Sequence, residues 1–236
     1  MQEFSTLDGA ILIDKPSGPT SHDVVDAIRR KFGIKKVGHC GTLDPAATGL
    51  LIIVLGRGTK LSEKLMGDDK VYEGTIRFGV STHSYDADGD VLETKPVPPL
   101  TLEQLNGSAH EFIGDQMQTP PMVSAIKKDG VPLYKLARKG IEVEREPRLV
   151  HIYNFRFTNY SEPNGEFRLA CTKGTYVRSI AHDLGQKIGC GAHLSALRRS
   201  ASGKFDVAEA TTLDAVLKMT TSELEKKVVP FLKLSI

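Results

Sequence analysis

The sequence predicts an α+β fold with a mixed, largely antiparallel central sheet flanked by helices. Segments patterned like strands and segments patterned like helices follow one another without the regular alternation of a parallel sheet. The 236 residues are 40% apolar, which suffices for the core of one large domain or two small ones. Because no repeat, low-complexity tract or linker divides the chain, we expect a single domain over residues 1–236, built as one body or as two lobes.

Six segments have the apolar runs or the alternation that is typical of strands. They are residues 10–14 (AILID), 50–56 (LLIIVLG), 71–80 (VYEGTIRFGV), 148–158, 166–172 and 194–203 (LSALRRSASG). The apolar side chains of the third segment, at mostly even spacing, are Tyr72, Ile76, Phe78 and Val80. Even spacing places side chains on one face of a strand, so we expect this face to be buried.

Helical patterning follows capping and turn signals. Ser21 is expected to cap a helix that ends at Gly33. The apolar positions of that helix are Val24, Val25, Ile28 and Phe32. The other predicted helices are residues 61–66, a helix with a Thr101/Gln104 capping box up to about Phe112, residues 132–140 after a turn at Asp129-Gly130, residues 175–188, and two short stretches after about Thr212.

Cysteine usage and hydropathy bear on the compartment. The three cysteines, Cys40, Cys171 and Cys190, have no CxxC spacing, which argues against a disulfide framework or a zinc ribbon. The N-terminus has no apolar run of signal length, and no segment approaches ~18 uncharged apolar residues. We therefore expect a soluble, cytoplasmic protein that does not enter a membrane.

The charge is unevenly distributed although the net charge is only +2. Residues 173–204 carry six Lys/Arg and one acid, and residues 127–148 carry seven basic and four acidic side chains. Acids gather over residues 86–93 and again after Asp206. Either one face binds a polyanion, or the lysines are simply solvated; charge alone leaves both open.

Several motifs are incomplete. No P-loop and no G-x-S-x-G elbow is present. DADGD (86–90) resembles a calcium loop, but its glycine comes two positions early and Val97 stands where the closing Glu belongs. His39 and Cys40 are adjacent and lack a second pair, so zinc is disfavoured.

One carboxylate, Asp44, lies in the otherwise uncharged, glycine-rich stretch GHCGTLDPAATGLL (38–51). Asp before Pro is common in turns, which gives a purely structural interpretation. The functional interpretation is an ionised nucleophile. In apolar surroundings that acid needs a cation to stay ionised, and Arg178, at the start of an amphipathic helix, is a candidate. A surface salt bridge is the alternative for Arg178.

The stretch around Asp44 resembles the signature of the TruB family of transfer-RNA pseudouridine synthases. Further blocks resemble that family in its order: LIDKPSGPTSHDVV (12–25), GRGTKL (56–61), KVYEG (70–74), PPMVSAIKKDGVPLYKLARKG (120–140), KGTYVRSIAHDLG (173–185) and GCGAHLSALRRS (189–200). The matches cover residues 10–205 or so. The resemblance implies the pseudouridine synthase catalytic fold and an isomerase that converts uridine 55 in the T loop of tRNA to pseudouridine, without a metal or organic cofactor.

The resemblance also implies roles for residues. Asp44 matches the catalytic aspartate, which attacks either uracil C6 or ribose C1′; the sequence leaves both open. Arg178 matches the arginine that pairs with that aspartate, and Tyr72 the tyrosine that stacks on the base and handles the C5 proton. His39 matches a residue that fills space in the RNA when the base flips out. The other expected substrate contacts are Tyr176 and Leu197, the lysines Lys15, Lys60 and Lys127 as phosphate contacts or structural supports, and Arg198 and Arg199 near the RNA backbone.

The end of the chain departs from the pattern. Many bacterial members continue into an RNA-binding PUA domain, whereas residues 206–236 are predicted to form a short helical extension with five acids and four lysines. We expect the PUA domain to be absent, so that RNA affinity is weaker or recognition falls to the catalytic domain; a truncated chain is the other explanation.

Three other kinds of function are alternatives. One is a tRNA-binding folding chaperone with little catalysis, which would not need Asp44. The second is a guide-RNA-dependent synthase, which would need protein partners and normally keeps the PUA domain; the expected absence of that domain argues against it. The third is an unspecialised α+β RNA-binding domain, against which the ordered motif blocks argue. We expect a monomer that acts on the T-arm stem-loop of tRNA without a protein partner or guide RNA.

Overall fold

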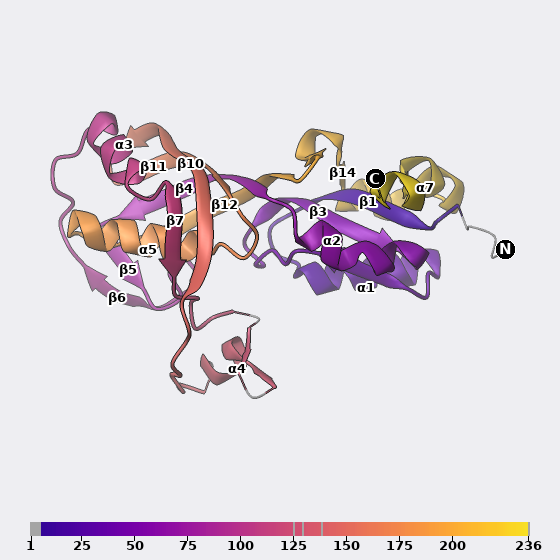
Figure 1. Cartoon of the computed structure of the whole chain (residues 1–236), viewed down its shortest axis with the longest axis horizontal. Coiled ribbons are helices and arrows are strands. Elements are labelled where there is room, and N and C mark those ends of the chain that lie inside the picture. Colours follow the sequence, from indigo (N-terminus) through magenta and orange to yellow (C-terminus); the bar gives the residue numbers. More distant parts are fainter. Residues whose placement is uncertain (1–5, 125, 129, 138, 236) are drawn as a thin grey trace. The chain divides into compact units, whose positions relative to one another are not determined.

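The structure, a computed structural model, describes residues 6–124, 126–128, 130–137 and 139–235. Its main sheet has the strand order β14-β1-β3-β12-β4-β11-β10-β7, with β13, β15 and β2 paired beside this path (Figure 1). Parallel and antiparallel pairs both occur, and helices flank the sheet. The predicted α+β class with a mixed, largely antiparallel sheet is therefore confirmed.

The elements have the following bounds. The strands are β1 Gly9–Lys15, β2 Val37–Cys40, β3 Thr48–Leu55, β4 Lys70–Phe78, β5 Val80–Thr82, β6 Val91–Thr94, β7 Gly114–Gln118, β8 Lys127–Lys128, β9 Val131–Pro132, β10 Arg148–Ser161, β11 Asn164–Cys171, β12 Ala192–Ser202, β13 Phe205–Asp206, β14 Thr211–Thr212 and β15 Val229–Pro230. The helices are α1 Ser21–Phe32, α2 Ser62–Met66, α3 Leu102–His110, α4 Leu133–Ala137, α5 Val177–Ile188, α6 Leu213–Lys218, α7 Thr221–Lys227 and α8 Phe231–Ser235, with 3-10 turns η1 Gly56–Leu61 and η2 Val207–Glu209.

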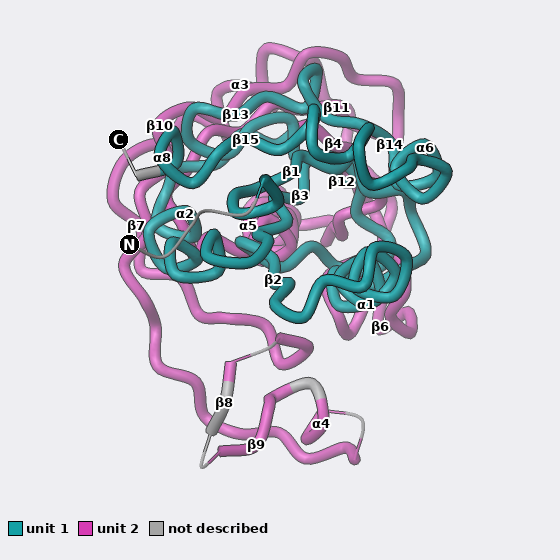
Figure 2. Tube along the Cα trace, turned by 90° about the vertical axis from the view of Figure 1, so that its right-hand side faces the viewer, with its two compact units in different colours: residues 1–72, 197–236 teal, residues 73–196 magenta. Residues whose placement is uncertain are grey.

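The chain divides into two compact units (Figure 2). Unit 1 comprises Met1–Tyr72 and Leu197–Ile236, and unit 2 comprises Glu73–Ala196. Strands β4 and β12 each contain residues of both units.

Unit 1 is built around β3. This strand pairs antiparallel with β1, from Gly9↔Leu55 to Lys15↔Gly49, and parallel with β12 at Arg199↔Gly49. Seven of its eight residues are buried, as expected for an uninterrupted apolar run in a central strand. Helices α1 and α2 pack against β2, the neighbour of β3.

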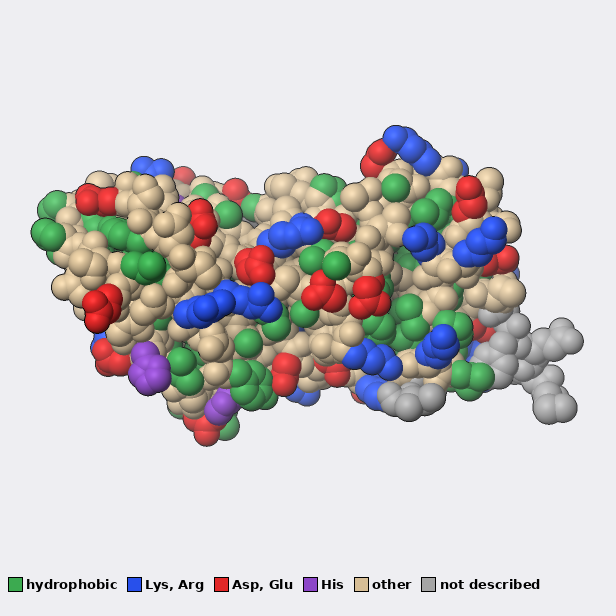
Figure 3. All heavy atoms as spheres, turned by 90° about the horizontal axis from the view of Figure 1, so that it is seen from above, with side chains coloured by type: hydrophobic (Ala, Val, Ile, Leu, Met, Phe, Trp, Pro, Cys, Tyr) green, Lys and Arg blue, Asp and Glu red, His purple; other side chains and the backbone are tan. Residues whose placement is uncertain are grey.

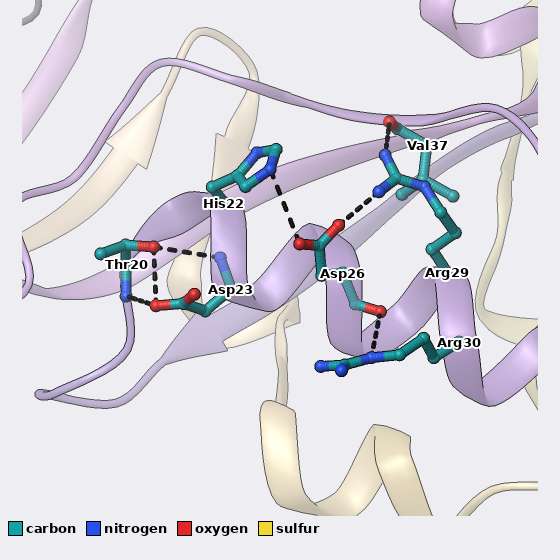
Figure 4. A network of polar contacts seen from close by, with 7 residues as sticks. All are labelled: Thr20, His22, Asp23, Asp26, Arg29, Arg30 and Val37. Atoms are coloured by element: carbon teal, nitrogen blue, oxygen red, sulfur yellow. Dashed lines mark hydrogen bonds and ion pairs between the residues drawn. The ribbon is translucent and has the colours of Figure 1, made fainter.

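Helix α1 begins with a capping box in which Thr20, not Ser21, is the N-cap. Thr20 Oγ1 accepts a hydrogen bond from the Asp23 amide at 3.0 Å, and the Asp23 carboxylate accepts one from the Thr20 amide at 2.8 Å (Figure 4). The prediction for Ser21 was wrong by one residue, because Thr20 has the extended backbone a cap needs. The helix ends at Gly33 as predicted, with Gly33 at φ +65°. On the same helix Arg29 donates to the Val37 carbonyl at 3.3 Å and so ties α1 to β2 (Figure 4).

Unit 2 contains an aromatic core between β4, β10 and β11. The rings of Phe78, Phe155, Phe157 and Phe167 pack with centroids 5.5–6.4 Å apart. Helix α3 packs against β10 and α5. The predicted strand over residues 71–80 is divided at Gly79, which has φ +86°, so Val80 belongs to β5 in a separate two-stranded sheet.

Between β7 and β10 the chain leaves the sheet of unit 2 and forms β8, β9 and α4 (Figures 1 and 2). The helix predicted over residues 132–140 is shorter, Leu133–Ala137, and Gly140 follows it at φ +68°. Asp129 of the predicted turn lies outside the described residues. In the part of the chain that is described, no helix combines the length and apolar character needed to cross a membrane.

Candidate active site

The loop that carries Asp44 is held by hydrogen bonds on both sides of this residue. On one side, the Leu43 amide donates to Ser21 Oγ at 2.9 Å, and Ser21 Oγ donates back to the Leu43 carbonyl at 3.1 Å. On the other side, the Pro45 carbonyl accepts from the Gly18 amide at 2.9 Å. Asp44 itself is half-buried, and its carbonyl accepts from the Ala47 amide at 3.1 Å. The loop therefore presents one carboxylate from a fixed backbone.

Lys15 also holds the loop that carries Asp44. Its side chain is fully buried, and Nζ donates to the carbonyls of Pro16 at 2.8 Å and Pro45 at 3.0 Å. Burial lowers the pKa of the ammonium to about 8, and the charge of Asp44 partly opposes that effect. Of the two roles expected for Lys15, phosphate contact or structural support, this position matches the support.

Two loop glycines are required by their backbone conformation. Gly41 has φ +85° and Gly49 has φ +98°, both in the left-handed region that side chains rarely adopt. A Cβ on Gly49 would lie 2.3 Å from the carbonyl oxygen of Arg199. At Gly41 the stretch therefore needs glycine for its backbone angle, and at Gly49 for both the angle and the close approach of Arg199.

Arg199 is a structural residue of the loop. It is 1% exposed, and its guanidinium donates to the Leu50 carbonyl at 2.8 Å and to the Gly41 carbonyl at 3.0 Å. The expectation that Arg199 meets the RNA backbone does not fit this buried position. The reason is that Arg199 faces β3 and the loop rather than solvent.

His39 lies in β2, at the entrance to the loop, and is half-buried. Its Nδ1 is buried and has no hydrogen-bond partner among the residues that the structure describes. Burial, and after it the charges of Arg199 and His22, lower the pKa of the imidazole. His39 is therefore a neutral ring at the position where the resemblance expects a residue that inserts into RNA.

Strand β12 brings Leu197 and Arg198 beside the start of β3. The Leu197 carbonyl accepts from Thr48 Oγ1 at 3.4 Å, and Leu197 is half-buried. Arg198 makes two hydrogen bonds to the Asp14 carboxylate, at 2.9 and 2.8 Å. This paired geometry fixes the guanidinium of Arg198 at the partly exposed end of β1.

Tyr72 and Lys60 occupy different parts of unit 1. Tyr72 lies in β4 and is 9% exposed, which confirms that its face of the strand is buried. Lys60 is exposed and follows the far end of β3, in η1. Eight residues of β3 span roughly 25 Å at ~3.3 Å per residue, so the structure does not bring Lys60 to the Asp44 loop. The side chain of Lys127 lies outside the described part.

In unit 2, Arg178 is buried at the start of α5. Its side chain is 6% exposed, and Nη1 lies 3.1 Å from Asp86 Oδ2. Nη1 also donates to the Ser84 carbonyl at 3.3 Å, and Nη2 to the Val123 carbonyl at 2.9 Å. A surface salt bridge, the alternative considered for Arg178, does not describe this buried guanidinium.

Tyr176 is the N-cap of α5 and has no side-chain cap of its own. Both of its backbone groups bind the amide of Gln118: the Tyr176 amide donates to Oε1 at 2.7 Å, and Nε2 donates to the Tyr176 carbonyl at 3.1 Å. Gln118 is 7% exposed. These two hydrogen bonds, called the Gln118 clamp below, fix the backbone at the start of α5 and so position both Tyr176 and Arg178.

Sequence reasoning missed the partners of these residues. They are Ser21 and Asp14 in unit 1, and Asp86 and Gln118 in unit 2. Asp86 had a signal, because it begins the DADGD stretch, but that stretch was compared only with a calcium loop, which it does not match. The described residues contain no group of three or more His, Cys, Asp or Glu that could hold a metal.

Charge is mixed over the surface. Figure 3 shows Lys and Arg side chains interspersed with Asp and Glu on the face it draws. In the basic segment 173–204, five of the six cations contact protein groups: Arg178, Lys187, Arg198, Arg199 and Lys204. That segment is therefore largely engaged within the fold.

Family models match almost the whole chain. Residues 29–177 match the model described as TruB family pseudouridylate synthase (N terminal domain), and residues 178–233 match the one described as tRNA pseudouridylate synthase B C-terminal domain.

Relatives and solved structures agree with that match. A tRNA pseudouridine synthase B from Opitutus terrae is 57% identical over 230 residues, 98% of this chain and 95% of the relative. One from Syntrophotalea carbinolica is 48% identical, over 92% of this chain and 71% of the relative. A chain in the crystal structure of a Cbf5-Nop10-Gar1 complex superposes with a TM-score of 0.77 at 27% identity. The superposition covers 97% of the present chain and 62% of the chain in that complex.

Proposed function

The chain belongs to the TruB family of pseudouridylate synthases and is a tRNA-modifying isomerase, and on that premise we propose that it converts uridine 55 in the T loop of tRNA to pseudouridine. The substrate element is the T-arm stem-loop. The purified chain acts as a monomer without a guide RNA or a protein partner.

One observation carries the proposal: the rigid presentation of Asp44. Ser21, Gly18 and Lys15 hold the backbone immediately before and after it, while the carboxylate is half-buried rather than sealed in the core. A loop fixed in this way suits a nucleophile, because a pre-positioned reacting group lowers the entropic part of the barrier. A purely structural Asp-Pro turn would not need a buried lysine beneath it.

The reaction is an isomerisation and needs no net oxidant or co-substrate. The bond between N1 and ribose C1′ breaks, the uracil turns, and a bond forms between C5 and C1′. C5 loses its proton to a base and N1 gains one, so the atoms balance. The Asp44 carboxylate forms a covalent bond with uracil C6 or ribose C1′ and is released at the end of the cycle.

The remaining roles follow the family resemblance. Tyr72 stacks on the target base and takes up the C5 proton, and Arg178 stabilises the ionised aspartate. His39 fills the gap in the RNA left by the flipped base, since an open duplex stack costs a few kcal/mol. Tyr176 and Leu197 contact the flipped nucleotide, and Arg198 and Lys60 contact the RNA backbone.

Tritium release tests the proposal. An unmodified T-arm transcript with tritium at uridine C5 is incubated with the purified chain in EDTA, and tritium in water is counted. The native chain is expected to release about one equivalent per transcript, and Asp44→Asn none. Asp214→Asn, which alters an exposed acid paired with Lys218, is the matched control and is expected to keep the native rate.

A second readout separates catalysis from binding. Electrophoretic mobility of the same transcript is measured with the native chain and with Asp44→Asn. If the native chain binds but releases no tritium, the protein is a folding chaperone and the enzymatic proposal is wrong. If Asp44→Asn releases tritium at the native rate, Asp44 is not the nucleophile.

A further inference from the structure

Tyr85 has an unusual backbone conformation next to the Arg178 site. Its φ is +65°, and among the described residues it is the one non-glycine with positive φ. For a bulky side chain this conformation is strained, and it persists only where the surrounding structure enforces it.

The turn at Tyr85 aims its two neighbours at Arg178. The Ser84 carbonyl, before it, accepts from Arg178 Nη1 at 3.3 Å, and the Asp86 carboxylate, after it, lies 3.1 Å from the same nitrogen. The turn at Tyr85 thus presents two acceptors, the Ser84 carbonyl and the Asp86 carboxylate, to one guanidinium nitrogen.

The Tyr85 ring ties this turn to helix α5. It stacks on the ring of His182 with centroids 3.9 Å apart and an interplanar angle of 18°. His182 follows Arg178 by four residues on α5, so the two side chains leave the helix from the same side, one turn apart. The ring stack and the Arg178–Asp86 ion pair thus both connect the turn at Tyr85 to helix α5, one helical turn apart.

Other contacts hold the turn but do not involve α5. The Tyr85 amide donates to the Thr82 carbonyl at 3.2 Å, and the Tyr85 carbonyl accepts from the Leu194 amide at 2.9 Å. Thr82 Oγ1 donates to the Asp86 carbonyl at 2.6 Å. These bonds fix the turn to β12 and β5, whereas the ring contact sets its distance from the helix that carries Arg178.

The environment keeps both rings neutral. Burial lowers the pKa of His182, with the charge of Asp183 opposing it, and burial raises the pKa of Tyr85. Nδ1 of His182 is buried and, within the described part of the chain, has no hydrogen-bond partner, so the ring is held by packing rather than by a polar contact at that atom. A flat stack of two neutral rings suits this setting.

We propose that Tyr85 and His182 form a positioning pair that fixes the guanidinium of Arg178 for the isomerisation. The inference rests on the proposed function, because it assigns the pair a task in that reaction. Neither ring is a catalytic residue; each acts through Arg178.

Four variants separate positioning from folding. Tyr85→Phe keeps the ring and is expected to keep the native kcat. Tyr85→Gly removes the ring but accepts the positive φ, so the turn is not strained by the substitution. We expect Tyr85→Gly to lower kcat about ten- to a hundredfold, with KM for the T-arm transcript within about threefold, because misplacement of a catalytic group affects the chemical step more than binding. His182→Ala should match Tyr85→Gly, and His182→Phe, which can still stack, should recover much of the loss.

The double variant tests whether the two rings act as one unit. Tyr85→Gly/His182→Ala is expected to be no slower than either single variant, because each alone already breaks the stack. Losses that multiply, or a native kcat in Tyr85→Gly, overturn the proposal.

A readout independent of activity distinguishes this inference from the proposed function. In protein labelled with nitrogen-15 arginine, the Arg178 guanidinium protons are assigned by their loss in Arg178→Lys, and their exchange with water is measured. Exchange is expected to be faster by about tenfold or more in Tyr85→Gly than in Tyr85→Phe, since the buried hydrogen bonds open more often. Equal exchange in both variants overturns the positioning role, even if the native chain releases no tritium.

Discussion

At the scale of single residues, Gly49 shows how strictly the Asp44 loop is specified. Its φ of +98° disfavours any side chain, and the close approach of the Arg199 backbone leaves no room for a Cβ. We predict that Gly49→Ala lowers the free energy of unfolding by more than about 3 kcal/mol, because strain of about 1–3 kcal/mol adds to a steric clash. The free energy of unfolding is measured by urea denaturation, with circular dichroism as the signal.

Gly33→Ala is the matched control for that prediction. Gly33 also has positive φ, +65°, but a Cβ there meets nothing within 4 Å. Gly33→Ala is therefore expected to lower the free energy of unfolding only by the strain of the left-handed backbone, about 1–2 kcal/mol. If the two variants lose the same stability, the contact between Gly49 and Arg199 contributes nothing.

Lys15 gives the loop a predictable pH dependence. The folded chain releases the Lys15 proton near pH 8, whereas the unfolded chain keeps it to about pH 10.5. Between these values the unfolded state binds more protons, so stability contributed by this group rises with pH. We predict that the unfolding free energy of the native chain, relative to Lys15→Met, increases from pH 8 to 10.5.

The measurement is a series of urea denaturation curves for both proteins across that window. Titration of the other lysines affects both proteins alike and cancels in the difference. A difference that stays constant from pH 8 to 10.5 would show that the folded ammonium titrates at its ordinary value.

At the scale of elements, α5 depends on an external cap. Tyr176 supplies no side-chain cap, and the Gln118 amide from β7 binds its amide and carbonyl instead. We predict that Gln118→Leu lowers the free energy of unfolding by about 1–3 kcal/mol, because both backbone groups lose a buried partner. Amide hydrogen exchange over residues 176–179 is expected to become faster.

Gln116→Leu is the control, since Gln116 lies two residues earlier on the same strand. We expect it to leave exchange in α5 unchanged. If Gln118→Leu also leaves that exchange unchanged, the first turn of α5 is held by other contacts and the Gln118 clamp is not what orders Tyr176.

Most helices and the long strands could be predicted because their signals are local, whereas the short strands β2, β6 and β7 were not predicted. The apolar run of β3, the alternation in β4, β10 and β11, and the capping box of α3 all lie within one segment. The break at Gly79 and the cap at Thr20 were missed, because they depend on backbone angles that neighbouring residues do not dictate. Partners of the site residues were missed for a different reason. Arg178 and Asp86 are 92 residues apart, and only the fold brings them together.

At the scale of the whole molecule, RNA binding depends on where the exposed cations lie. The net charge is +2, and most of the basic segment 173–204 contacts protein groups. Affinity for a polyanion must therefore come from the local placement of exposed cations rather than from the overall charge. The hollow beside η1 is lined by three exposed lysines, Lys35, Lys36 and Lys60, together with the half-buried Arg57 and one acid, Asp8.

Salt dependence measures how many of these cations meet phosphates. Each phosphate contact contributes about 0.7–0.9 to the slope of log K against log salt concentration. We predict that Lys60→Gln weakens T-arm binding and reduces that slope by this amount, measured by fluorescence anisotropy of a labelled transcript between 50 and 300 mM KCl. Lys218→Gln is the matched control, because Lys218 is equally charged but 75% exposed on α6 and paired with Asp214 at 2.6 Å. It should leave the slope unchanged, since Lys218 does not line the hollow and is already paired with a carboxylate. An equal drop in both variants would mean that RNA senses only the total charge, and an unchanged slope in Lys60→Gln would remove Lys60 from the RNA contact surface.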